Sequence, residues 1–144
     1  MTVHFIPTSP EGAPRLPVVL LVEDHLDTRL MYAEFLSSRF TILTAGDGRE
    51  ALDMMVVGHL PDLVITDLAL PGMGGLELIA MMRQDEALRN VPVICMSGYG
   101  GHALEQRAQV AGCDRILQKP CMPDALADAA EEVIRAFRDR GRPS

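Results

Sequence analysis

The sequence contains few aromatic residues and no tryptophan, which limits what its core can be built from. Only 4% of its residues are Phe, Trp or Tyr. Hydrophobic residues nevertheless make up 48% of the 144-residue chain and charged residues 23%, a balance that is typical of soluble globular proteins. We therefore predict one ordinary domain whose core consists of Val, Leu, Ile, Met and Ala.

The sequence also lacks an excess of positive charge. Its net charge is −7 at neutral pH, whereas a surface that binds the nucleic-acid backbone needs clustered Lys and Arg. Basic residues gather between Arg135 and Arg142, where Asp139 interrupts them. We interpret this segment as a solvated helix end, where the helix dipole favours cations, and we expect no direct binding of nucleic acid.

Cysteines and long apolar runs are scarce as well. Cys95, Cys113 and Cys121 form no CxxC pair, so neither a disulfide framework nor a zinc site is indicated. Reduced thiols in a cytoplasmic protein are the simplest interpretation. No apolar run approaches the ~20 residues that cross a bilayer, and the N-terminus lacks the pattern of a signal peptide. We therefore expect a cytoplasmic protein with no membrane partner.

The N-terminal segment has the composition of an arm. Four prolines fall between Pro7 and Pro17, among small residues, and such segments rarely form a packed element. We predict a flexible arm over residues 1–16, one folded domain over residues 17–141 and a short tail over residues 142–144.

The rest of the chain alternates apolar strands with helical patterns five times. Predicted strands cover residues 18–22, 41–44, 63–65, 91–96 and 116–117. Predicted helices cover residues 26–39, 47–57, 76–85, a segment ending at Ala111, and residues 123–138. The strands are continuously apolar, which indicates burial on both faces. The pattern therefore predicts an α/β domain with a parallel sheet covered by helices on both sides.

Polar side chains stand where four of the five predicted strands end. The first strand is followed by Glu23 and Asp24, the third by Asp67, the fourth by Ser97 and the fifth by Lys119. In an open α/β sheet, ligands bind at the carboxyl ends of the strands. We therefore expect three carboxylates, one hydroxyl and one ammonium to meet at the same edge.

Three neighbouring carboxylates repel one another, and a hard divalent cation relieves that repulsion. A metal ion, an ammonium and a hydroxyl around one carboxylate are the groups that phosphoryl transfer requires, since that reaction depends on alignment and on neutralising the equatorial oxygens. A carboxylate nucleophile needs no general base to activate it. The edge of the sheet is therefore a candidate phosphoryl-transfer site.

The same residues carry a resemblance to the receiver domains of response regulators in two-component phosphorelays. The resemblance covers about residues 17–138. Each motif is short, but four of them occur in the family's order, each at a strand end. The motifs are Leu20-Leu21-Val22-Glu23-Asp24, Asp67 with Leu70-Pro71-Gly72-Met73-Gly74-Gly75, Ser97-Gly98, and Lys119-Pro120.

This resemblance implies a fold and a metal site. The fold is the flavodoxin-like, doubly wound five-stranded parallel sheet with strand order 2-1-3-4-5 and five helices. The metal is Mg²⁺ or Mn²⁺. Asp24 and Asp67 would bind it directly, Glu23 would bind through water, and the backbone carbonyl of Ala69 would complete the shell.

The resemblance also implies the roles of the reacting groups. Asp67 would accept the phosphoryl group, Ser97 would hydrogen-bond it and Lys119 would pair with it. The peptide bond before Pro120 is expected to be cis. Such a domain is not an enzyme for an external substrate, because it catalyses only its own phosphorylation and dephosphorylation.

Partners follow from the resemblance too. The expected phosphodonor is a sensor histidine kinase or a histidine phosphotransfer domain. Since little chain follows the domain, we expect the output to come from contact with an unknown protein, from competition for phosphoryl groups in a relay, or from a domain outside this sequence. We expect a monomer or a weak homodimer formed through the fourth and fifth helices. The first helix carries a wide apolar face, most of which we assign to the core and part of which we consider a docking surface: Leu26, Leu30, Met31, Phe35 and Leu36.

Some positions depart from the family pattern. Ile116 stands where the family has a Tyr or Phe that swings inward on phosphorylation, and a β-branched side chain is stiff and has no ring. Either Ile116 is ordinary core packing or the signal travels through Gly98–Gly101 and the fourth helix, with Tyr99 as an alternative ring that also shields the acyl phosphate. Gly74 replaces an Asp, which removes a helix cap.

Other functions fit less well. The segment Gly98–Ala103 matches a dinucleotide-binding GxGxxA pattern, but it follows the fourth strand and lacks the acidic residue that should come later. An aspartyl-phosphate hydrolase would need a second carboxylate at Ala69. The alternative that stays open is a degenerate receiver that binds proteins independently of phosphorylation.

Overall fold

The computed structural model describes residues 15–70, 72–98 and 101–141. Within these residues, five parallel strands form one sheet in the order β2-β1-β3-β4-β5. The strands are β1 (Val18–Val22), β2 (Thr41–Ala45), β3 (Leu63–Asp67), β4 (Val93–Ser97) and β5 (Arg115–Gln118). The helices are α1 (Leu26–Leu36), α2 (Gly48–Val56), α3 (Gly75–Gln84), α4 (His102–Ala111) and α5 (Pro123–Gly141). The predicted fold class and strand order are confirmed.

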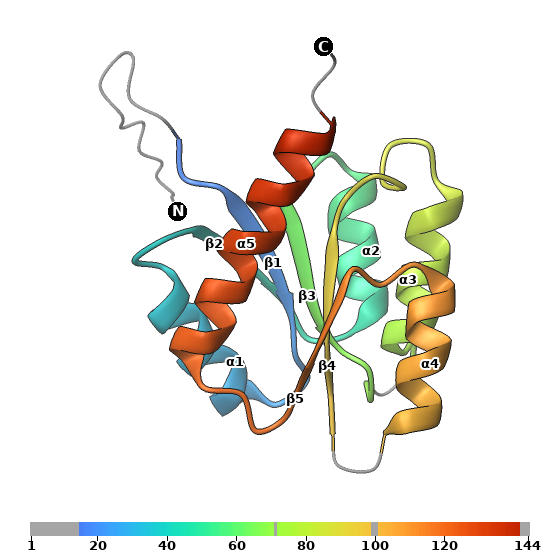
Figure 1. Cartoon of the computed structure of the whole chain (residues 1–144), viewed down its shortest axis with the longest axis horizontal. Coiled ribbons are helices and arrows are strands. Elements are labelled where there is room, and N and C mark those ends of the chain that lie inside the picture. Colours follow the sequence, from blue (N-terminus) through green and yellow to red (C-terminus); the bar gives the residue numbers. More distant parts are fainter. Residues whose placement is uncertain (1–14, 71, 99–100, 142–144) are drawn as a thin grey trace.

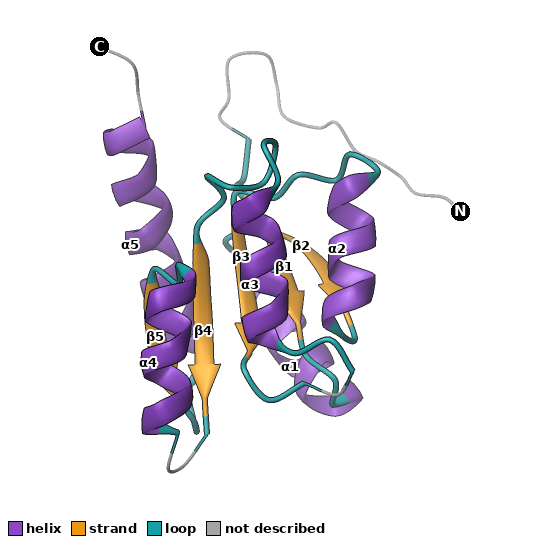
Figure 2. Ribbon diagram, turned by 90° about the vertical axis from the view of Figure 1, so that its right-hand side faces the viewer, coloured by secondary structure: helices purple, strands orange, loops and turns teal. Residues whose placement is uncertain are grey.

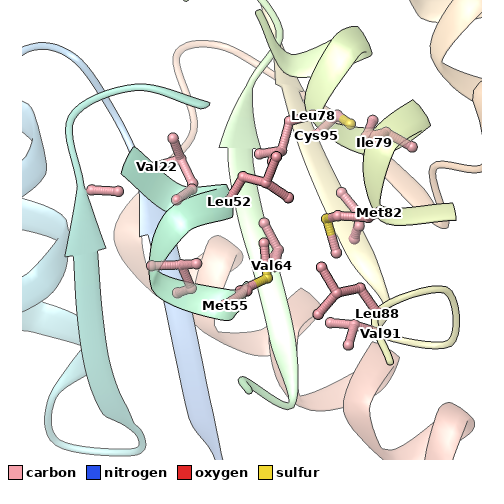
Figure 3. Packing of buried hydrophobic residues seen from close by; sticks show 14 of the residues in the cluster. Val22, Leu52, Met55, Val64, Leu78, Ile79, Met82, Leu88, Val91 and Cys95 are labelled. Atoms are coloured by element: carbon pink, nitrogen blue, oxygen red, sulfur yellow. The ribbon is translucent and has the colours of Figure 1, made fainter. Parts of the chain in front are cut away.

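Helices cover both faces of the sheet, as the continuously apolar strands predict. Helices α1 and α5 lie on one face and α2, α3 and α4 on the other (Figures 1 and 2). Along β4, Cys95 belongs to the cluster beneath α2–α4, while Ile94 and Met96 belong to the cluster beneath α1 and α5. Figure 3 shows the first of these clusters, which aliphatic and sulfur-containing side chains fill. The sheet therefore separates two apolar cores.

Burial follows the position of each strand in the sheet. Every residue of the central strands β3 and β4 is buried. The edge strands β2 and β5 are mostly half-buried, and each has one exposed residue. Residues 1–14 and 142–144, for which we predict an arm and a tail, lie outside the described residues.

Several helix boundaries differ from the sequence prediction. Helix α1 ends at Leu36, three residues before the predicted end, because the hydroxyls of Ser37 and Ser38 donate back to main-chain carbonyls of the last turn. Helix α2 begins after Asp47, whose side chain accepts a hydrogen bond from the backbone N–H of Glu50 at 2.8 Å. Helix α5 continues to Gly141.

The prediction that core packing accounts for most of the apolar face of α1 is wrong. Of the five residues assigned to that face, only Leu36 is buried. Leu26, Leu30, Met31 and Phe35 are between 43% and 56% exposed, while Tyr32, which we did not assign to the face, is buried. The helix is apolar on two sides, and the sheet covers only one of them.

Helix α3 lacks a side-chain cap, as expected for glycine at this position. Gly74 precedes the helix with an extended backbone, and its N–H donates to Oε1 of Glu77 at 3.2 Å. A capping box consists of two hydrogen bonds, and the one from the backbone N–H of the N-cap residue to the Glu77 side chain is present here. It needs no side chain at Gly74.

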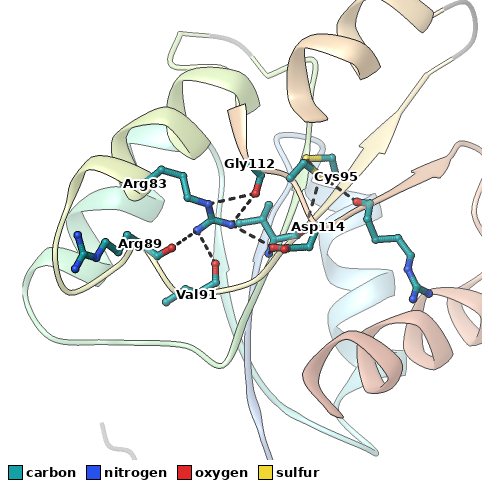
Figure 4. Close-up of polar contacts among 9 residues, drawn as sticks. Arg83, Arg89, Val91, Cys95, Gly112 and Asp114 are labelled. Atoms are coloured by element: carbon teal, nitrogen blue, oxygen red, sulfur yellow. Dashed lines mark hydrogen bonds and ion pairs between the residues drawn. The ribbon is translucent and has the colours of Figure 1, made fainter. Parts of the chain in front are cut away.

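Arg83 connects three segments at the amino-terminal edge of β4 and β5 (Figure 4). Its guanidinium donates twice to the carbonyl of Gly112, at 2.8 and 3.2 Å, and to the carbonyls of Arg89 and Val91 at 3.0 and 2.8 Å. It also pairs with Asp114 at 3.2 Å. One side chain of α3 thus donates hydrogen bonds to backbone carbonyls at the end of α4 and in the loop that leads into β4.

We expect Arg83→Ala to lower the free energy of unfolding by about 2 kcal/mol, because the carbonyls of Gly112 and Val91 lose their donor. Arg83→Lys should recover only part of the loss, since an ammonium cannot reproduce the planar fork of a guanidinium. Urea unfolding followed by circular dichroism measures both. Exposed Arg107 provides the control, and Arg107→Ala should change stability by less than about 0.5 kcal/mol. Equal losses at positions 83 and 107 would contradict the assignment.

Candidate functional site

The structure brings together the acidic residues that follow the strands. Asp67 is the last residue of β3, and Glu23 and Asp24 directly follow β1. One carboxylate oxygen from each of the three lies within 4.8 Å of the others. This cluster forms because β1 and β3 are parallel neighbours whose carboxyl ends reach the same edge.

Asp67 is buried and held at both of its oxygens. It is 3% exposed. Its Oδ1 accepts a hydrogen bond from the backbone N–H of Ala69 at 2.9 Å, and its Oδ2 accepts one from the ammonium of Lys119. The carboxylate is therefore oriented before any ligand arrives.

Lys119 follows β5 and is the only lysine in the sequence. Its backbone N–H donates to the carbonyl of Ser97 at 2.8 Å, which anchors the residue to the end of β4. Burial alone would lower the pKa of Lys119, but the hydrogen bond with Asp67 and the charges of Asp67 and Glu23 outweigh burial, so the pKa is raised. The side chain is consequently a cation at neutral pH. The peptide bond to Pro120 is cis, as predicted.

Glu23 is a buried carboxylate with an unsatisfied atom. Its Oε2 accepts a hydrogen bond from the backbone N–H of His25 at 3.1 Å, while its Oε1 has no hydrogen-bond partner among the described residues, and the residue is 2% exposed. Burial raises the pKa of Glu23, and the negative charges of Asp67 and Asp24 add to this effect. An orphaned carboxylate oxygen beside two other carboxylates fits a divalent cation that prefers oxygen ligands.

The other predicted residues occupy the same edge. Asp24 is exposed, and Ala69 is exposed in the turn after Asp67. Ser97 is 1% exposed, and its hydroxyl donates to the carbonyl of Gly98 at 3.4 Å. In the sheet, Met96 pairs with Asp67, so Ser97 lies one residue beyond the Asp67 register. The edge therefore presents the carboxylates, the ammonium and the hydroxyl together.

The two predicted switch residues have different outcomes. Ile116 is half-buried and packs against the cluster beneath α2–α4, which fits the core-packing alternative. Tyr99 lies outside the described residues.

Sequence reasoning missed two residues that position the site. The hydroxyl of Tyr32, on α1, donates to the carbonyl of Cys121 at 2.6 Å, two residues after Lys119. The guanidinium of Arg29 donates to the carbonyl of Glu23 at 2.8 Å. Neither residue belongs to a recognisable motif, and no local pattern in the sequence signals these contacts.

No helix in the described part of the chain is both long enough and apolar enough to cross a membrane.

The sequence is similar to those of known proteins. Residues 19–131 match the sequence model of the response regulator receiver domain family. The polar-differentiation response regulator DivK of Brucella ovis is 34% identical over 103 residues, which cover 71% of this chain and 83% of DivK. The hybrid signal transduction histidine kinase D of Dictyostelium discoideum is 30% identical over 118 residues, which cover 82% of this chain but only 8% of that kinase.

Solved structures of signalling proteins have the same fold as this chain. The chemotaxis protein CheY4 of Vibrio cholerae superposes with a TM-score of 0.76 at 27% identity, covering 82% of this chain and 98% of that one. The receiver domain of a histidine kinase from Syntrophus aciditrophicus superposes with a TM-score of 0.78 at 25% identity, covering 89% and 95% of the two chains. This chain therefore belongs to the response regulator receiver domain family and is a receiver domain of two-component signalling.

Proposed function

We propose that this chain, through its receiver domain at residues 17–141, accepts a phosphoryl group on Asp67 from a phosphohistidine and passes the signal to a protein partner by a change in conformation. The observation that carries the proposal is the environment of Asp67. Its carboxylate is buried, oriented at both oxygens, and surrounded by Glu23, Asp24 and Lys119. Receiver domains are signalling modules that interact with histidine kinases or phosphotransfer proteins.

In the proposed reaction, an oxygen of Asp67 attacks the phosphorus of the phosphohistidine. A P–O bond forms while the P–N bond breaks, and the imidazole nitrogen keeps the electron pair and takes up a proton. The nucleophile is already ionised, so the protein contributes mainly alignment and charge. The two hydrogen bonds to Asp67 hold the carboxylate in place before the donor arrives.

Lys119 and Ser97 would stabilise the transferred group. The ammonium of Lys119 contacts Asp67 directly, so it is within reach of a phosphoryl group attached there. The hydroxyl of Ser97, which lies at the next strand end, would donate to a second phosphoryl oxygen. Both groups would act where negative charge develops in the transition state.

Receiver domains bind Mg²⁺ at an acidic site, and this chain has such a cluster. Asp24, Asp67, Glu23 through water and the carbonyl of Ala69 would hold Mg²⁺ or Mn²⁺. A bound divalent ion supplies positive charge that relieves the repulsion among the carboxylates and the phosphoryl oxygens.

The exposed apolar side of α1 is the surface we assign to the phosphodonor. The helix begins directly after Glu23, Asp24 and His25, so its first turn borders the site. Leu26 and Leu30 are more than half exposed there. Large exposed apolar side chains beside a reactive group favour a protein partner, and a sensor kinase or a histidine phosphotransfer domain fits this surface.

The proposed route of the signal runs from Ser97 into α4. The helix begins after Gly101, and a Cβ at Gly101 would lie 2.4 Å from Oγ of Ser97. The start of α4 is therefore packed against the hydroxyl that would move toward the phosphoryl group. With Ile116 in the core, this contact can transmit the change without an aromatic ring at position 116.

Incubation with acetyl phosphate and Mg²⁺ should add the mass of one phosphoryl group to the intact chain. Asp67→Asn and removal of the metal with EDTA should each abolish the gain, whereas Asp53→Asn, on the exposed side of α2, should leave it unchanged. Intact mass spectrometry checks all four samples. A folded protein that gains no mass would instead favour the phosphorylation-independent binding module.

Lys119→Gln should slow phosphorylation by acetyl phosphate about 10²-fold, because one preorganised charge next to the transferred group is lost. The rate of mass gain at saturating Mg²⁺ measures the effect. Gln118 is exposed beside it, so Gln118→Ala should keep the wild-type rate. A Lys119→Gln protein that reacts at the normal rate would exclude the ammonium from the reaction.

Glu23→Gln should stabilise the metal-free protein at neutral pH and weaken Mg²⁺ binding. A carboxyl whose pKa is raised in the folded state favours folding when protonated, so stability without metal falls as the pH rises from the ordinary value of 4.5 through the raised value. The substitution removes this cost. Chemical unfolding in EDTA and titration calorimetry with Mg²⁺ measure the two effects. Exposed Glu86 is the control, and Glu86→Gln should change neither quantity. A destabilised Glu23→Gln protein would refute this interpretation.

A further inference from the structure

Two cysteines that do not belong to the acidic edge lie next to each other. Cys95 is in the middle of β4 and fully buried, and Cys113 follows the end of α4 and is half-buried. Their sulfur atoms are 2.9 Å apart, within about 1 Å of the ~2.05 Å length of a disulfide bond. Figure 4 draws Cys95 together with Gly112 and Asp114, the residues on either side of Cys113.

The backbone holds both thiols in this position. Cys95 pairs with Thr66 of β3 and Ile116 of β5, so hydrogen-bonded strands flank it on both sides. The N–H of Cys113 donates to the carbonyl of Ala108 at 2.9 Å, which closes the end of α4 around a left-handed Gly112. The two sulfur atoms are therefore held close together by β4 on one side and by the end of α4 on the other.

The two thiols differ in their electrostatic surroundings and in their exposure. The hydrogen bond with the Cys95 thiol lowers the pKa of Cys113 despite its burial, while the same contact and burial raise the pKa of Cys95. Cys113 is also the more exposed of the two. A thiolate is the nucleophile in cysteine oxidation, so Cys113 would react first and Cys95 would resolve the product.

We propose that Cys95 and Cys113 form a reversible intramolecular disulfide when the protein meets hydrogen peroxide. The thiolate of Cys113 attacks one peroxide oxygen, and the O–O bond breaks to give a sulfenic acid and, after protonation, water. The sulfur of Cys95 then attacks the sulfenic sulfur. The S–S bond forms, the S–O bond breaks, and the hydroxide leaves as water with the proton of Cys95. The two cysteines lose two electrons and the peroxide gains them, and a dithiol reverses the reaction.

The disulfide ties the C-terminal end of α4 to the centre of β4, next to Ile116, since Ile116 is the β5 partner of Cys95. The other end of α4 packs against Ser97 through Gly101. Oxidation therefore fixes the helix at the end opposite to the candidate site. The influence of this tether on signalling rests on the proposed function, whereas the disulfide does not.

Counting the thiols tests the proposal. The full chain is treated with hydrogen peroxide, denatured, alkylated with N-ethylmaleimide and weighed intact. Since the sequence contains three cysteines, the reduced protein should take three labels. The oxidised protein should take one label, on Cys121, and dithiothreitol should restore three. Trypsin cuts after Arg89, Arg107 and Arg115, which places Cys95 and Cys113 in separate peptides. These peptides should be joined without reductant.

Two variants complete the test. After peroxide treatment, Cys113→Ser should still take two labels, one on each remaining cysteine. Cys121→Ser should take none, and dithiothreitol should restore two. In the oxidised wild type, amide exchange at Gly112 and Cys113 should slow, with no change in Cys113→Ser. Three labels after peroxide, a link that includes Cys121, a link between two chains, or irreversible oxidation of Cys113 without a link would each overturn the proposal. Because thiols are counted, the result is independent of whether Asp67 accepts a phosphoryl group.

Discussion

The parallel direction of all five strands is the constraint on which the rest of the molecule depends. Parallel strands bring every carboxyl end to one edge, and charged residues stand at the ends of β1, β3 and β5. Three carboxylates within a few ångströms of one another, with a single lysine beside them, leave an excess of negative charge. The apolar cores on both faces fix the sheet. The direction of its strands therefore places these carboxylates together, and their combined negative charge attracts a cation.

The opposite ends of β4 and β5 are organised by a different kind of contact. Arg83 and Asp114 there satisfy backbone groups of the helix end and of the adjoining loops. Asp114 accepts from the backbone N–H of Val93 at 2.8 Å and from Arg83 at 3.2 Å, so the pair closes the start of β4. One end of the sheet thus carries an excess of negative charge. At the opposite end, Arg83 and Asp114 balance each other's charge. Helix α4 runs between the two ends of the sheet, and Cys113 lies just beyond its C-terminal end, next to Gly112, to which Arg83 donates.

Sequence patterns predicted the layers and the charged edge, because both depend on features that repeat along the chain. The strand order came from the resemblance to receiver domains, and the structure confirms it. Burial on both faces is visible as uninterrupted apolar strands, and the edge is visible as polar residues at the strand ends. Contacts that depend on three-dimensional detail were not predicted. The apolar residues of α1 gave no indication that Tyr32 faces inward while Leu30 faces solvent. The spacing of Cys95 and Cys113 suggested no pairing, because a strand, a helix and a helix cap intervene before the sulfurs meet.

The position of the only lysine has a practical consequence. Because Lys119 is the sole lysine and contacts Asp67, any isotope introduced through lysine reports on this one site. Labelling with ¹⁵N at the lysine Nζ would produce a single ammonium resonance, free from overlap and requiring no assignment. The half-exposed side chain is also the one internal amine that acylating reagents can modify. The sequence thus gives the protein its own spectroscopic probe within the acidic edge.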